Sequence, residues 1–131
     1  MNNIDYKVGI YIRLSREDEE KEKYSESESV QNQRTLLMQY IKENKLNFIS
    51  EYVDDGVSGT SFDRPAFNRM IADIEAGKIN MIVTKDLSRL GRNYVQSGLY
   101  IETYFPEHEV RFVAILDNID TAYDTSNNDI A

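Results

Sequence analysis

The sequence predicts an α/β domain with a mainly parallel sheet of four to five strands and helices on both faces. Short apolar runs alternate with amphipathic segments of about a dozen residues along most of the chain. That spacing is typical of right-handed βαβ units, in which a helix connects two parallel strands. With 131 residues, of which 40% are hydrophobic, the chain is large enough to form one domain with its own core.

The first half of the chain predicts two strands separated by a helix. Val8 to Leu14 is rich in β-branched and aromatic residues, as strands are. Residues 17–28 carry seven acids and two lysines, a local charge of −5, and we expect a solvated, mobile loop there. Apolar residues then follow helical spacing from Val30 up to Asn44, with Gln33 on the same stripe. A second strand is expected over residues 48–53.

The second half predicts two further helices and two further strands. Residues 54–64 (DDGVSGTSFDR) are rich in Gly and Ser and indicate a loop. Pro65 suits the first turn of a helix, which Gly77 is placed to end. The remaining expectations are a buried strand over 81–84, a polar turn over 85–93, a helix over 94–105 closed by Pro106, a strand over 111–116, and a polar, aperiodic stretch over 117–131.

Composition excludes several kinds of site. Without cysteine there is no disulfide and no cysteine metal site, and His108 is the only histidine, so zinc sites built on paired His or Cys are excluded. We expect His108 to be a surface residue. The longest apolar run, Phe112 to Leu116, is too short to span a bilayer, and the first residues lack the apolar core of a signal peptide. We therefore expect a cytoplasmic protein with no membrane partner.

The arginines indicate an anionic substrate, although the net charge of −8 taken alone argues against nucleic acid. Because functional groups collect at the carboxyl ends of parallel strands, arginines in the loops after those strands should converge. A guanidinium matches phosphate oxygens and keeps its charge when buried. Five of the eight arginines lie in such loops: Arg13, Arg16, Arg64, Arg89 and Arg92.

Ser15 is the candidate nucleophile from the residues alone. It shares a pleat face with Arg13, and a hydroxyl beside several guanidinium groups could attack phosphorus. Arg13 could instead be a strand-end arginine paired with Asp54 or Asp55. Those two aspartates could also bind magnesium, or serve with Lys85 in a phosphate-binding, receiver-like signalling module. That module, however, needs an acidic pair after the first strand, where this chain has Arg13 and Ser15.

Four motifs resemble the catalytic domain of the serine recombinases, the resolvase and invertase family. They are YIRLS (11–15), SVQNQR (29–34), YVDDGVSGTSFDRP (52–65) and KDLSRLGRN (85–93). The segments DGVSGTSFDRP (55–65) and KDLSRLGRN (85–93) are most similar to the large branch of the family, the phage integrases and transposon recombinases. The resemblance covers residues 6 to about 120. Four motifs in order, each in its expected strand and loop context, make a specific signal.

The resemblance implies a resolvase-like fold and a site-specific DNA recombinase. Ser15 would attack the scissile phosphate, leaving a 5′ phosphoserine link and a free 3′ hydroxyl, without metal, ATP or other cofactor. Ser88 stands where small resolvases often have an aspartate, so a proton-transfer role is not carried over to it. The other residues carried over are the phosphate-holding Arg13, Arg64, Arg89 and Arg92, the site glutamine Gln33, and the active-site aspartate Asp54, with Asp55 as its alternative.

The resemblance also implies a longer parent protein. Family members continue into a long helix and basic DNA-binding domains, which assemble as dimers and tetramers on DNA. We therefore expect residues 1–131 to be a single catalytic domain excised from such a protein. Alone, it should be a monomer or weak dimer with negligible DNA affinity. Most of its negative charge lies in residues 17–28, so an acidic surface and a local cationic site can coexist.

Overall fold

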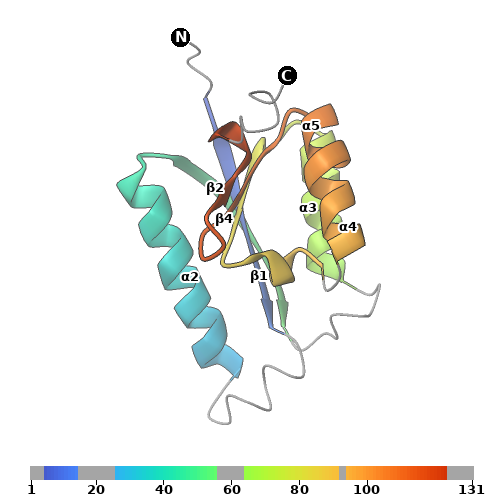
Figure 1. Ribbon diagram of the computed structural model, residues 1–131. Helices are drawn as coiled ribbons and strands as arrows, with labels where there is room; N and C mark the ends of the chain where they lie inside the picture. Colours follow the sequence, from blue (N-terminus) through green and yellow to red (C-terminus); the bar gives the residue numbers. More distant parts are fainter. Residues whose placement is uncertain (1–4, 15–25, 56–63, 92–93, 124–131) are drawn as a thin grey trace.

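The computed structural model describes residues 5–14, 26–55, 64–91 and 94–123. Within them, a five-stranded sheet has the order β2-β1-β3-β4-β5, with helices on both faces (Figure 1). The first four strands are mutually parallel, and β5 is antiparallel to β4. The α/β fold expected from the sequence is confirmed. The strands are β1 (Lys7–Leu14), β2 (Asn47–Asp55), β3 (Met81–Thr84), β4 (Arg111–Ala114) and β5 (Ile119–Asp120).

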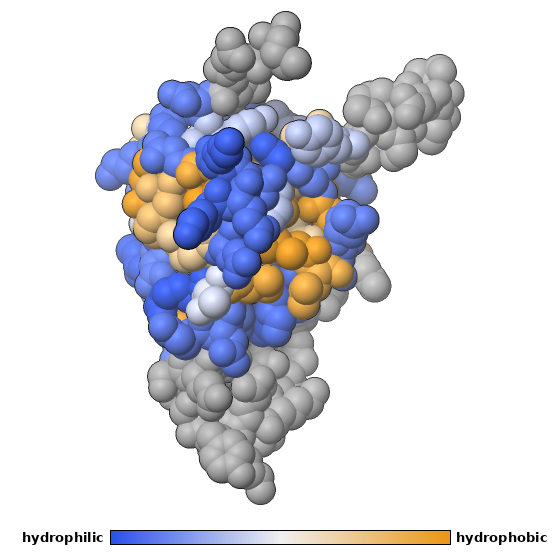
Figure 2. All heavy atoms as spheres, turned by 90° about the vertical axis from the view of Figure 1, so that its left-hand side faces the viewer, coloured by the Kyte–Doolittle hydropathy of each residue, from blue (hydrophilic) through white to orange (hydrophobic). Residues whose placement is uncertain are grey.

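The helices form one layer on each side of the sheet (Figure 1). One face is covered by α2 (Glu26–Glu43), whose Leu37 and Ile41 join a core with Ile10 and Ile12 of β1. This side of the molecule is mostly hydrophilic on its outer surface (Figure 2). The other face is covered by α3 (Pro65–Glu75) and by the continuous helical segment α4 (Tyr94–Leu99), a π-helical turn (Tyr100–Tyr104) and α5 (Phe105–Glu107).

The central strand β1 sets the position of the site. It lies between β2 and β3, and every residue after Lys7 is buried. The period of two sends Ile10 and Ile12 toward α2 and Tyr11 toward α3. Arg13 is therefore on the Tyr11 side, at the carboxyl end of the strand. The strand pairs in register with β2 so that Arg13 lies beside Asp54.

Two boundaries differ from the sequence prediction in the first half of the chain. Helix α2 begins at Glu26, inside the segment expected to be a loop. Strand β2 extends through Asp55, so the two aspartates expected in a loop are its last residues. Residues 17–25 and 56–63, which make up most of the two predicted loops, lie outside the described ranges.

Pro106 does not close the third predicted helix, which continues to Glu107. A proline lacks the backbone N–H and its ring clashes with the carbonyl four residues back in a regular helix. Here the preceding turn is π-helical, and the Phe105 N–H bonds to the Tyr100 carbonyl five residues back. We attribute the tolerance of Pro106 to this wider turn, which changes the position of the carbonyl that the ring would meet.

The sequence prediction also missed β5, because a two-residue strand is too short to show alternation. The predicted strand over 111–116 ends at Ala114, and a turn follows in which Asn118 has a φ of 57°. The Arg111 guanidinium donates to both Asp120 carboxylate oxygens, at 2.9 and 2.7 Å, and fixes β5 against β4. None of the helices in the described ranges is both long and apolar enough to span a bilayer.

Candidate active site

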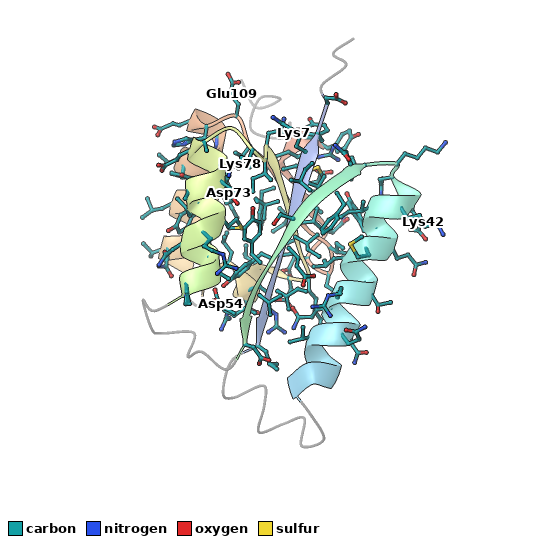
Figure 3. The ribbon with its side chains drawn as sticks, turned by 180° about the vertical axis from the view of Figure 1, so that it is seen from behind. Lys7, Lys42, Asp54, Asp73, Lys78 and Glu109 are labelled. Atoms are coloured by element: carbon teal, nitrogen blue, oxygen red, sulfur yellow. The ribbon has the colours of Figure 1, made fainter. Side chains whose placement is uncertain are left out.

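Three arginines from separate segments meet at the carboxyl edge of the sheet. Arg13 lies near the end of β1, Arg64 immediately precedes α3, and Arg89 ends a 3-10 helix (Leu87–Arg89) that follows β3. Their exposed fractions are only 4%, 5% and 8%. Figure 3 labels Asp54 at this end of the sheet, and Asp73 and Lys78 toward the opposite end. The predicted convergence is present for these three residues.

Backbone carbonyl groups hold the three guanidinium groups in place. The Arg89 carbonyl accepts from Arg13 Nε at 3.3 Å and from Arg64 Nη2 at 3.1 Å. In return, Arg89 Nη1 donates to the Arg13 carbonyl at 2.8 Å, and Arg64 Nη2 also donates to the Leu90 carbonyl at 2.9 Å. Carbonyl groups are neutral, so these hydrogen bonds orient the cations without cancelling their charge. Arg89 also lies near a carboxylate, with its Nε 3.5 Å from Asp86 Oδ1.

The Arg64 side chain is further fixed by aromatic rings. Its guanidinium carbon lies 4.0 Å from the ring centroid of Phe67 and 5.5 Å from that of Tyr11. Both distances are within the range of cation–π attraction, which is strongest when the cation is shielded from water. Arg64 Nε also donates to the Tyr11 hydroxyl at 3.3 Å. A flat guanidinium can make these stacking and hydrogen-bonding contacts together, and an ammonium group cannot.

Asp54 connects this cluster to the start of α3. Its Oδ1 accepts from the Ala66 N–H at 2.9 Å, and its Oδ2 accepts from the Phe67 N–H at 3.0 Å and the Tyr11 hydroxyl at 2.8 Å. The carboxylate therefore satisfies two of the N–H groups that the first turn of a helix leaves unpaired. Asp54 is 2% exposed, whereas Asp55 is exposed, so only the former lies within the cluster.

Tyr11 is the residue at the centre of this arrangement that sequence reasoning missed. Its side chain is fully buried and its hydroxyl bridges Asp54 and Arg64. Burial is the main reason that the pKa of Tyr11 is raised above its ordinary value, so the hydroxyl stays protonated and donates to Asp54. Strand alternation could have identified Tyr11 from the sequence, because Tyr11 is two residues before Arg13 and must lie on the same face of the sheet.

Gln33 reaches the same end of β1 from the other face of the sheet. It is 1% exposed, on the buried stripe of α2 where the sequence placed it. Its Nε2 donates to the Arg13 carbonyl at 3.3 Å. Its Oε1 is buried and has no hydrogen-bond partner among the described residues. A buried amide oxygen in this state can accept from a group that enters the end of the strand.

The remaining predicted site residues have different outcomes. The candidate nucleophile Ser15 and the fourth arginine, Arg92, lie outside the described residues, as does Arg16. Ser88 is exposed and donates through its hydroxyl to Asp86. His108 is exposed at the end of α5, as expected of a surface residue. No group of three or more potential metal ligands occurs among the residues that the structure describes.

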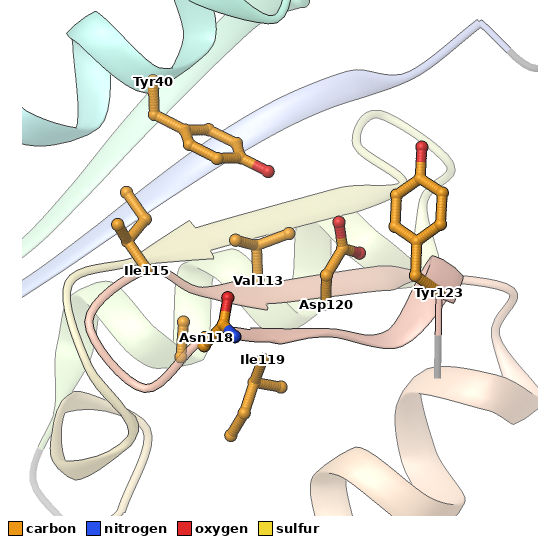
Figure 4. A pocket seen from close by; sticks show the side chains of 8 residues that line it. Tyr40, Val113, Ile115, Asn118, Ile119, Asp120 and Tyr123 are labelled. Atoms are coloured by element: carbon orange, nitrogen blue, oxygen red, sulfur yellow. The ribbon is translucent and has the colours of Figure 1, made fainter. Parts of the chain in front are cut away.

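A hollow of about 670 Å³ lies elsewhere, beside β4 and β5 (Figure 4). Its lining includes Tyr40, Val113, Asp120 and Tyr123, and the two tyrosine rings lie on either side of the Asp120 carboxylate. That carboxylate is already paired with Arg111. The hollow shares no lining residue with the arginine cluster and has no arginine among its lining residues, so the cluster remains the better anion site.

Comparison with known proteins identifies the family. Residues 8–130 match the family model of the resolvase N-terminal domain. The chain belongs to the resolvase family of serine recombinases. The catalytic domain of TP901-1 integrase is similar, with a TM-score of 0.78 and 26% identity, covering 95% of this chain and 88% of that one. A resolvase-family site-specific recombinase from Streptococcus pneumoniae has a TM-score of 0.76 and 28% identity, covering 95% and 82%.

Two curated relatives match shorter parts of this serine recombinase domain. A putative DNA recombinase of Bacillus subtilis (strain 168) is 32% identical over 85 residues, which are 65% of this chain and 16% of that protein. The uncharacterized immunity region protein 3 of Bacillus phage phi105 is 33% identical over 75 residues, 57% of this chain and 87% of that protein. Together with the burial of Asp54 under three donors, family membership removes the support for a receiver-like signalling module.

Proposed function

We propose that this serine recombinase domain cleaves and rejoins DNA, with Ser15 as the nucleophile. The observation that carries the proposal is the fixed cluster of Arg13, Arg64 and Arg89 at the edge where β1 ends. Ser15 follows the last residue of that strand directly in the sequence. Buried guanidinium groups held before substrate binds can stabilise charge that develops on phosphate oxygens without reorganising.

The reaction is a pair of phosphoryl transfers. Ser15 Oγ forms a bond to the scissile phosphorus and gives its proton to a solvent water, while the bond from phosphorus to the 3′ oxygen breaks. That oxygen takes up a proton from Arg92 or from a water bound to it, leaving a 3′ hydroxyl and a 5′ phosphoserine. Rejoining reverses these steps with a 3′ hydroxyl as the attacking group. The arginines bind the non-bridging oxygens of the phosphate throughout the reaction. They stabilise the transition state most, because negative charge develops on these oxygens there.

The other site residues act by positioning. Asp54 anchors the first turn of α3 and, through Tyr11, orients Arg64. Gln33 holds the Arg13 carbonyl and leaves its Oε1 to accept from a donor near the end of β1. In this proposal Arg13, Arg64, Arg89 and Arg92 contact the phosphate, and Asp54 does not take part in proton transfer, because its oxygens are occupied by three donors.

We propose that residues 1–131 act as the catalytic domain of a longer recombinase. The chain spans only 16% of the Bacillus subtilis relative, so most of that protein is built from other segments. The whole protein would bind DNA through those segments and work as a homodimer or tetramer. The net charge of −8 supports this division of labour, because a domain with this charge gains little from counterion release on DNA.

The proposal is tested by replacing the nucleophile in the full-length protein that carries this domain. On a nicked DNA that contains the recombination site, the unmodified protein should accumulate a covalent adduct that denaturing gels resolve. Ser15→Ala should abolish the adduct, because the change removes the oxygen that forms the phosphoester in this proposal. Ser50→Ala, a serine on β2, is the matched control and should retain it. Adduct of undiminished yield from Ser15→Ala would refute the proposal.

A further inference from the structure

Two carboxylates hold the turn between β3 and Arg89. Asp117 Oδ2 accepts from the Leu87 N–H at 2.5 Å, and Asp86 contacts the residues that follow. Asp86 has extended backbone angles, φ −151° and ψ 171°, and precedes the 3-10 helix Leu87–Arg89. Its Oδ1 accepts from the Ser88 N–H at 3.1 Å and from the Ser88 hydroxyl at 2.5 Å. A short helix of this kind has few hydrogen bonds of its own, so the capping residue largely determines its direction.

The same carboxylate oxygen also contacts the arginine at the end of the turn. Asp86 Oδ1 lies 3.5 Å from Arg89 Nε, and the two side chains are 23% and 10% exposed. At this distance the contact is an ion pair and not a hydrogen bond, whereas Arg89 Nη1 donates a hydrogen bond to the Arg13 carbonyl at 2.8 Å. Asp86 therefore fixes both the backbone of the turn and the side chain that the turn presents.

The position of this turn affects the other two arginines. The Arg89 carbonyl is the shared acceptor for Arg13 Nε and Arg64 Nη2, and the Ser88 carbonyl accepts from Arg13 Nη2. A shift of the turn would move these acceptors relative to β1 and α3. The geometry of the whole arginine cluster thus depends on a turn that Asp86 holds.

We propose that Asp86 is a positioning residue for the oxyanion site of this domain, an inference that rests on the proposed function. It acts through the 3-10 turn and Arg89 and does not contact the phosphate. The positioning role strengthens anion binding, whereas the negative charge of Asp86 weakens it, because a carboxylate near an anion site repels the anion. The two effects predict opposite results when the side chain is removed, so they can be separated.

The experiment follows binding of inorganic phosphate to this chain by the arginine Nε–H signals in proton–nitrogen NMR spectra. Phosphate should shift the Arg13, Arg64 and Arg89 signals of the unmodified protein. Asp86→Ala should weaken the apparent affinity about tenfold, a factor typical of a lost cap and ion contact, and should shift the Arg89 Nε–H signal even without phosphate. Asp86→Asn keeps an acceptor oxygen and should bind within about threefold of the unmodified protein.

Each outcome bears on a different claim. Asp73→Asn removes a carboxylate toward the opposite end of the sheet and should leave phosphate binding unchanged (Figure 3). Unchanged or tighter binding by Asp86→Ala would overturn the positioning role and leave the proposed function intact. If Asp86→Ala does not fold, tighter binding by Asp86→Asn would overturn it instead, because repulsion by the Asp86 charge would then outweigh its positioning effect. Absence of any arginine shift in the unmodified protein would refute the oxyanion site itself, and both proposals with it.

Discussion

Arg64 is buried, and none of its contacts with the described residues is an ion pair with a carboxylate. The chemistry of this one residue explains how its charge is accommodated. Its donors reach two backbone carbonyl groups and the Tyr11 hydroxyl, and its flat face covers the Phe67 ring. Burying a charge is costly unless its donors are satisfied, and here hydrogen bonds and cation–π attraction both compensate. The charge therefore stays available for an incoming anion, which a tight ion pair with a carboxylate would have reduced.

Tyr11→Phe tests whether the hydroxyl bridge stabilises the folded state. The change removes one donor to Asp54 and the acceptor for Arg64 Nε, both in a fully buried place. We expect the free energy of unfolding to fall by about 1 to 3 kcal/mol, measured by urea denaturation, because buried groups lose their partners. Tyr123→Phe is the control: that side chain is 74% exposed and should change stability by less than about 0.5 kcal/mol. Equal midpoints for both variants would contradict the bridge.

At the scale of elements, the sequence predicted α3 well, because its signals are local. Pro65 is at the first turn, Phe67, Met70 and Ile74 form the buried face, and Gly77 follows the end with a φ of 79°. The sequence could not show that Asp54, far from this helix along the chain, caps it. That contact depends on the register of β2, which tertiary packing sets.

The two glycines near helix ends should respond in opposite ways to alanine. Gly77 has space for a methyl group, with no atom within 4 Å, but its positive φ strains any other residue. Gly77→Ala should therefore destabilise the fold by about 1 kcal/mol. Gly98 lies within α4, also with open space and no positive φ, so Gly98→Ala should stabilise by up to about 1 kcal/mol. Thermal unfolding of both variants checks this; a change of the same sign in the two would contradict it.

At the scale of the whole molecule, the spacing of apolar segments predicted a mainly parallel sheet with helices on both faces, but not the order of its strands. The rule that functional groups collect at the carboxyl ends of parallel strands placed Arg13 and Arg89 at one edge, and the family resemblance added Gln33. They did not predict the partners of these groups. The carbonyl groups that hold the arginines belong to the backbone of other segments, and the π-helical turn that accommodates Pro106 has no sequence signal.

The buried tyrosines predict how stability of the whole domain depends on alkaline pH. Burial, followed by the hydrogen bond to Asp73, raises the pKa of Tyr52 to about 12, and burial also raises the pKa of Tyr11 and of Tyr104. In the unfolded state tyrosines lose their protons near pH 10, whereas the buried tyrosines of the folded state keep them. Deprotonation above pH 10 therefore stabilises the unfolded state relative to the folded state. The free energy of unfolding should be level up to about pH 9 and then fall, by at most about 1.4 kcal/mol per pH unit for Tyr52. Urea midpoints from pH 8 to pH 11 measure this. Tyr52→Phe should give a shallower fall than the unmodified protein, and an equal slope would show that this tyrosine is not responsible.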